Sequence, residues 1–145
     1  MPIDMQSAIV AEVIARLAAV DSFGGRVFED SVLRVIDSAD DTFPDDFIVI
    51  QPGTTEEVER QSGGGVRERV ILNITCITKR RDFAVHLRAA RLGIKVVLPG
   101  TKAGLTTQGV QLAAFQTETP MPPGQGRSWA CHVLPVQITY VQSLK

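Results

Sequence analysis

The amino-acid sequence predicts an α+β fold in which an antiparallel-rich sheet of about four to five strands carries two helices on one face. Two segments, one near the N-terminus and one in the middle of the chain, have apolar residues at helical spacing, and several other segments alternate apolar and polar residues. At 145 residues the chain is long enough to bury a core of its own, so we expect one domain over residues 1–145.

The composition is that of a globular protein. Hydrophobic residues make up 44% and charged residues 21% of the chain. No apolar run approaches the roughly 20 residues that cross a bilayer, and the N-terminus lacks a signal-peptide pattern, so we expect no membrane partner. The two cysteines, Cys76 and Cys131, are too few for a disulfide framework, which favours a reduced, cytosolic setting.

The N-terminal half is predicted to contain one helix, three short strands and two loops. Asp4 is a suitable N-cap for the helix, and the sequence Ser22-Phe23-Gly24-Gly25 ends it. Pro52-Gly53 is expected to end the third strand. The predicted ranges are Pro2–Val20 for the helix, Arg26–Glu29, Ser31–Ile36 and Asp46–Gln51 for the strands, Asp37–Asp46 for an acidic loop and Thr54–Gly65 for a flexible loop.

In the second half, Val66–Thr78 is the clearest strand, and Asp82 is expected to cap a helix that ends near Leu98. The apolar arc of this helix spans roughly 200°, which is wider than the ~100° stripe that covers a single core. Burial against both the sheet and the first helix would explain the width, and so would an oligomer interface. The remaining predictions are strands over Val110–Thr117 and Ser128–Val141, an irregular segment over Thr119–Gly126, and a sheet edge or bulge at Pro135.

Charge is unevenly distributed along the chain, although the net charge is only −1. Residues 29–59 hold ten acids against one base, and residues 60–102 hold ten bases against two acids. One interpretation is that these charges pair within one subunit. The other is that each subunit has an acidic and a basic flank, which favours head-to-tail contacts that close into rings. The flanks would then be formed by Asp40, Asp41, Asp45 and Asp46 and by Arg81, Arg88, Arg91 and Lys95.

Few residues form a pattern that is typical of a catalytic, phosphate-binding or metal-binding site. His86 and His132 have no acid at a motif-like spacing, so structural or surface roles are favoured over general-base catalysis. Ser62 lacks the nucleophile-elbow pattern, and the glycines after it lack the Gly-Lys-Ser/Thr of a phosphate loop. The acidic loop could attract a divalent ion, but its spacing is not that of an EF-hand. We therefore expect no catalytic site, metal or cofactor.

The basic residues of the second helix could in principle contact nucleic-acid phosphates. Few aromatic residues are interleaved with them for base stacking, and the chain as a whole is slightly acidic. An acidic protein surface is therefore the favoured partner for this helix.

Five segments together carry a likeness to a known family: Ala8–Leu17, Arg26–Glu29, Asp46–Ile50, Arg69–Thr75 running directly into a helix, and Val133–Tyr140. In order and character they resemble the tail terminator (tail completion) proteins of long-tailed bacteriophages and prophages. The resemblance spans nearly the whole chain as a pattern of elements, and the Pro- and Gly-rich segment Thr119–Gly126 departs from a minimal version of that family.

The resemblance implies a structural virion protein without catalytic residues. It implies a hexameric ring at the head-proximal end of the tail, assembled in the host cytoplasm. The ring caps the tail tube, stops its polymerisation and offers a surface to the neck (connector) protein, while DNA passes through the bore without specific binding. Loops that contact tube or neck are expected at Gly63, Gly64, Gly65, Arg67, Arg69, Gln125 and Arg127.

Three alternatives remain open at the level of sequence. The first is a head–tail connector or neck subunit, which shares size and composition with a terminator. The second is a cytosolic enzyme or small-ligand-binding domain, which a pocket with His86 or His132 beside a carboxylate would favour. The third is a nucleic-acid-binding accessory factor, which salt-sensitive retention on DNA would favour.

Overall fold

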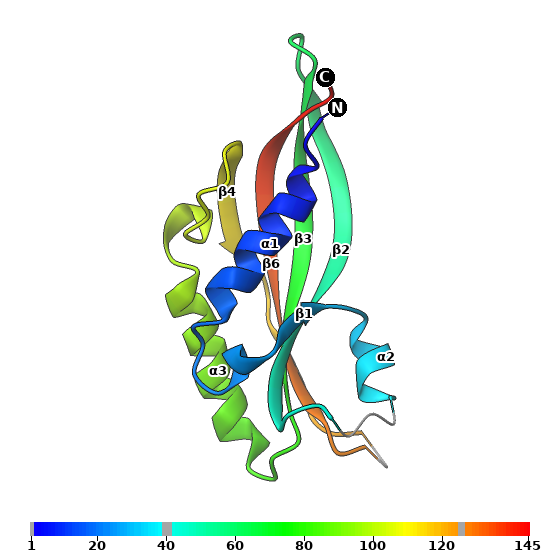
Figure 1. Ribbon diagram of the computed structural model, residues 1–145, viewed down its shortest axis with the longest axis vertical. Coiled ribbons are helices and arrows are strands. Elements are labelled where there is room, and N and C mark those ends of the chain that lie inside the picture. Colours follow the sequence, from blue (N-terminus) through cyan, green and yellow to red (C-terminus); the bar gives the residue numbers. More distant parts are fainter. Residues whose placement is uncertain (1, 39–41, 125–126) are drawn as a thin grey trace.

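The computed structural model describes residues 2–38, 42–124 and 127–145 and confirms the predicted α+β class (Figure 1). Its sheet has six strands in the order β1-β2-β3-β6-β4, with β5 paired to β6, and only the β1–β2 pair is parallel. In chain order the elements are α1 (Met5–Leu17), β1 (Val27–Glu29), α2 (Val32–Ile36), β2 (Asp46–Arg60), β3 (Gly65–Thr78), α3 (Phe83–Val97), β4 (Val110–Phe115), β5 (Thr119–Met121) and β6 (Ala130–Ser143). Short 3₁₀ turns lie at Phe23–Gly25 and Gly100–Lys102.

Helices α1 and α3 pack against one face of the sheet, as predicted. Their buried residues join a single apolar cluster with alternate residues of the central strands, among them Ile50, Leu72 and Ile138. Residues of the opposite parity, such as Phe47 and Ile77, belong to a second cluster on the other face. Helix α2 covers that second cluster at one end of the sheet, and the sequence did not predict it (Figure 1).

The prediction of a strand over Ser31–Ile36 was wrong. These residues form α2, in which the Ser31 hydroxyl accepts a hydrogen bond from the amide of Arg34. The buried residues Val32 and Val35 are three positions apart, a spacing that places both on the same side of a helix. In so short a segment the β-branched residues suggested a strand, but the cap and the burial of this one side stabilise a helical turn.

Strand β2 continues past Pro52-Gly53, so the predicted loop over Thr54–Gly65 was also wrong for most of its length. The register between β2 and β3 shifts between Pro52 and Thr55, and such a bulge accommodates a proline that cannot donate a ladder hydrogen bond. Only Gln61–Gly64 forms the turn, and Gly64 has a φ of 91°, a conformation that favours glycine. Beyond the bulge most β2 side chains are exposed, and this removes the alternation by which strands are recognised.

Part of the segment predicted to be irregular is ordered. Thr119–Met121 forms β5 and pairs with Cys131–Val133 of β6. Pro135 lies in β6 between the residues that pair with β4 and those that pair with β5. Its carbonyl accepts a hydrogen bond from the amide of Gln116, where the chain leaves β4. This gap behaves as a local sheet edge, which is why proline is tolerated in an interior strand.

The caps of the two long helices differ. Asp4 accepts hydrogen bonds from the amides of Gln6 and Ser7, as predicted for an N-cap. Asp82 occupies the N-cap position of α3, but its side chain makes no capping hydrogen bond and instead contacts His86. None of the helices in the described part of the chain has the length and hydropathy needed to span a membrane.

Glu12 ties α1 to the loop that precedes β4. Its two carboxylate oxygens accept hydrogen bonds of 2.6–2.9 Å from the amides and hydroxyls of Thr106 and Thr107. Burial has the largest single effect and would raise the pKa of Glu12, but these four hydrogen bonds together outweigh it and lower the pKa to about 2. The charged carboxylate therefore stabilises the folded state.

We expect the variant Glu12→Gln to lose about 1 kcal/mol of unfolding free energy at pH 7, because an amide offers only one acceptor oxygen to these four donors. Since folding lowers the pKa, the stabilisation is present above the ordinary value of 4.5 and is lost as the pH falls towards 2. Urea denaturation of both proteins at pH 7 and pH 3 measures this. An unchanged difference between the two pH values would contradict the assignment.

Candidate subunit interface on helix α3

The wide apolar arc of α3 divides into a buried side and an exposed side. Leu87, Ala90 and Ile94 are buried in the core. In contrast, Val85, Leu92 and Val96 are 58%, 58% and 68% exposed. Because residues three, four and seven apart lie on the same side of a helix, these three side chains and the exposed Ala89 form one continuous strip, the α3 stripe. Burial against the sheet and α1 therefore explains only half of the apolar arc.

A groove of about 520 Å³ runs along one side of the α3 stripe. One wall is formed by α3 residues that include Leu92, Gly93 and Val96, and the other by the chain between α1 and β1, from Ala19 to Phe23. Together, stripe and groove give an apolar surface bordered by polar groups, which is typical of an interaction site.

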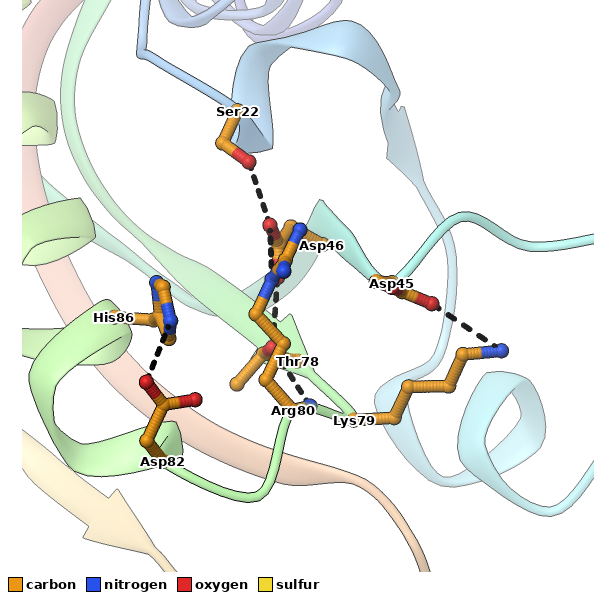
Figure 2. Close-up of polar contacts among 8 residues, drawn as sticks. All are labelled: Ser22, Asp45, Asp46, Thr78, Lys79, Arg80, Asp82 and His86. Atoms are coloured by element: carbon orange, nitrogen blue, oxygen red, sulfur yellow. Dashed lines mark hydrogen bonds and ion pairs between the residues drawn. The ribbon is translucent and has the colours of Figure 1, made fainter.

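Asp46 is hydrogen-bonded to Ser22, which lines the side of the groove opposite α3 (Figure 2). Its carboxylate accepts hydrogen bonds from the hydroxyls of Ser22 and Thr78 and forms an ion pair with the guanidinium of Arg80. Ser22 has a φ of 67°, which is a strained backbone conformation for a residue other than glycine. Asp46 therefore connects a strained turn to the start of β2 and the end of β3.

The Asp46 side chain is only 3% exposed, and its environment favours the charged form. Burial is the largest single influence and acts to raise the pKa, but the hydrogen bonds from Ser22, Thr78 and Arg80 outweigh it. The pKa of Asp46 is consequently held below its ordinary value. The sequence placed Asp46 in a solvated acidic loop, and this part of the prediction was wrong because three donors distant in the sequence converge on it.

Two of the four basic residues predicted for an interface are held by another residue of the same chain. Glu118 lies between β4 and β5 and contacts Arg91 at 2.5 Å, Lys95 at 2.6 Å and His132 at 2.8 Å. The hydrogen bond from Arg91 is the main cause that keeps the pKa of Glu118 well below its ordinary value, against the effect of burial. Among the described residues, Arg81 and Arg88 have no such carboxylate partner, and both are exposed.

The acidic and basic stretches of the sequence pair largely with each other inside the subunit, as the first interpretation of the charge pattern proposed. Strands β2 and β3 lie side by side, and their pairing brings opposite charges together across the hairpin and at its base. These ion pairs are Asp45–Lys79, Asp46–Arg80, Glu56–Arg69 and Glu59–Arg67, and a further pair, Glu57–Arg60, lies within β2. A basic nucleic-acid surface is correspondingly reduced, because only Arg81 and Arg88 of the predicted group lack a carboxylate in the described part of the chain.

Both histidines have a carboxylate neighbour, which was the condition named for an enzyme. His86 contacts Asp82 at 3.1 Å and lines the same groove as Ser22 (Figure 2). The hydroxyl of Ser22, however, is hydrogen-bonded to Asp46 and not to His86, so these two residues do not form a nucleophile–base pair. The second histidine, His132, is held in the Glu118 cluster with Arg91 and Lys95.

The structure places the predicted loop residues at two separate locations. Gly63 and Gly64 lie in the β2–β3 turn, Gly65 begins β3, and Arg67 and Arg69 lie within that strand. Arg127 contacts Asp37 at 3.0 Å. The residues Asp40, Asp41 and Gln125 lie outside the described ranges. Within those ranges no group of three or more histidine, cysteine or acidic residues could hold a metal ion.

Neither cysteine is part of a reactive site. Cys76 and Cys131 are both buried with free thiols. Burial raises the pKa of Cys76 to about 12 and that of Cys131 to about 11. Thiols in this state react slowly, because the thiolate is the nucleophile.

Comparison with protein-family models and with curated proteins finds no match. Among solved structures, the chain is similar to a chain in the virion of a native gene transfer agent particle. The superposition has a TM-score of 0.60 at 15% sequence identity and covers 90% of this chain and 92% of the other. The two chains share a fold.

Proposed function

We propose that this chain is a structural virion protein, a tail terminator whose ring caps the tail tube, stops polymerisation and provides the surface for head attachment. The single observation that supports this most is a shared fold along nine-tenths of the chain with a subunit of a virion particle. The exposed α3 stripe adds physical support, because a ring subunit must keep an apolar surface for its neighbours.

The shape of the subunit suits a ring between two partners. The β2–β3 turn, with Gly63 and Gly64, lies at one end of the molecule beside both chain termini, and the start of β6 lies at the other end (Figure 1). Arg127 lies three residues before β6. Helices α2 and α3 lie on opposite sides between these ends. In our proposal the ends contact tail tube and neck protein, and the sides contact neighbouring subunits in a ring. The resemblance implies that this ring has six subunits and that DNA passes through its bore.

We expect that adding this protein to a phage lacking its own terminator, but carrying the matching tube protein, restores tails of uniform length. The reason is that a ring bound to the last tube subunits blocks further addition. Tube lengths measured by electron microscopy test this, with the same phage without the protein as control. Overlong tubes together with protein bound at the head would instead support the connector alternative, and absence from tails and heads alike would contradict a virion role.

A further inference from the structure

The α3 stripe is an exposed apolar face that no residue in the described part of the chain covers. Val85, Leu92 and Val96 are each more than half exposed, and the adjoining groove is open. We propose that this stripe packs against the α2 side of a second copy of the same chain, in a head-to-tail contact. This inference deepens the proposed ring by naming the two surfaces that meet, and it therefore rests on that function.

Charge opposes a contact between two α3 stripes. The stripe is bordered by Arg88, and Arg81 lies two residues before the helix. Both are exposed and have no carboxylate partner among the described residues. A two-fold contact would bring these like charges together, and such a juxtaposition is unfavourable when it is desolvated. The acids on this side are Asp21, which lines the groove, and Asp82, which contacts His86, and Arg88 pairs with neither. The stripe therefore fits a different surface that has an apolar centre and acidic surroundings.

The α2 side of the chain has this character. Leu33 is 58% exposed on α2, and Glu29, Asp30 and Asp37 lie three or four residues from it. Asp30 and Asp37 each contact one arginine of the same chain, whereas Glu29 has no ion pair among the described residues. None of the other exposed leucine, isoleucine, valine or methionine side chains has carboxylates on both of its sides in the sequence; at most one side carries an acid. Complementarity of charge thus selects Leu33 and its neighbours as the counterpart of the α3 stripe.

The positions of the two surfaces allow the contact to repeat. Helices α3 and α2 lie on opposite sides of the sheet's lower half in Figure 1. A contact between unlike surfaces on opposite sides of a subunit leaves one of each surface free, so a further copy can add until the ring closes. A contact between two copies of the same surface would end at a dimer.

We expect Leu92→Ser to raise the dissociation constant of self-association about tenfold or more, because the variant no longer buries a leucine side chain in the contact. Arg88→Glu should weaken association in the same direction and remove part of its salt dependence. Matched controls are Leu144→Ser and Arg60→Glu, which alter an exposed leucine and an exposed arginine near the β2–β3 turn. Sedimentation of the full chain over a range of concentrations measures this, and equal effects of test and control variants would overturn the inference.

Cross-linking identifies the surfaces that meet. Leu33→Cys and Leu92→Cys are made as separate proteins, in which the native cysteines stay buried, and are mixed with a short bismaleimide. Head-to-tail contact gives a cross-linked pair in the mixture and little in either protein alone, whereas cross-linked Leu92→Cys alone would show a two-fold contact and overturn the inference. A ring without the mixed cross-link, or a chain that stays monomeric, also overturns it. The tube-length assay decides the proposed function independently, since it requires no ring in free solution.

Discussion

Replacing Phe47 with alanine is expected to lower the free energy of unfolding by about 3–5 kcal/mol, the usual effect of removing a fully buried aromatic ring. Phe47 has no exposed surface and belongs to the cluster on the α2 face of the sheet. Its ring stacks with those of Phe28 and Phe43 and meets Trp129 edge-on, with centroids 5.0–6.0 Å apart. Urea denaturation followed by tryptophan fluorescence measures the loss.

Two related variants separate the effect of this ring from a general loss of hydrophobicity. Phe47→Leu keeps much of the volume and should cost clearly less than the alanine variant. Phe43→Ala removes a ring at the half-buried border of the cluster, so its cost should also be smaller. If all three variants lost the same free energy, Phe47 would not be the centre of this core. Because the cluster also supports α2, Phe47→Ala should weaken self-association as well.

The elements that could be predicted from sequence are those whose own length carries a repeating pattern. The helices α1 and α3 and the strands β3 and β6 each bury one side along a dozen or more residues, so periodicity alone identifies them. Helix α2 and strand β5 have five and three residues, too few for a period to show. Their conformation depends on what they pack against or pair with, and that information lies in distant parts of the chain.

The candidate subunit interface remains a prediction, and the sequence pattern of α3 indicates only some of its features. The width of the apolar arc of α3 could be explained by burial alone or by an additional partner, and the exposed Val85, Leu92 and Val96 show that burial covers only part of the arc. The sequence grouped four basic residues of this helix as one surface, but Glu118 binds two of them, Arg91 and Lys95, from beyond β4. Reversing Arg91 would therefore break an internal ion pair and test stability more than assembly, which makes Arg88 the better probe.

Asp46 illustrates best what local reading of the sequence misses. It stands last in a run of acidic residues, and its neighbour Asp45 does contact Lys79 at the surface, with a side chain 53% exposed. One position further on, β2 begins, and the side chain turns into a cluster of Ser22, Thr78 and Arg80 (Figure 2). Only the tertiary structure brings these three donors together.

Asp46→Ala is expected to lower the free energy of unfolding at pH 7 by about 2–4 kcal/mol, because the buried hydroxyl of Thr78, the hydroxyl of Ser22 and the guanidinium of Arg80 lose their acceptor together. Asp45→Ala is the matched control and should cost less than about 1 kcal/mol, as an exposed ion pair does. Urea denaturation of both variants measures the difference. Equal losses would show that the hydrogen-bond cluster around Asp46 contributes no more to stability than the exposed ion pair of Asp45.

The pH dependence of Asp46→Asn provides an independent test of the same cluster. Folding lowers the pKa of Asp46, so its stabilisation is complete above the ordinary aspartate value of about 4 and is lost as the pH falls below it. The difference in unfolding free energy between wild type and Asp46→Asn should therefore shrink between pH 7 and pH 3. Since Asp46 also holds Ser22 in its strained turn, hydrogen exchange at the amides of Ser22 and Phe23 should accelerate in the variant. Unchanged exchange there would mean that the turn at Ser22, which lines the groove beside α3, keeps its conformation without Asp46.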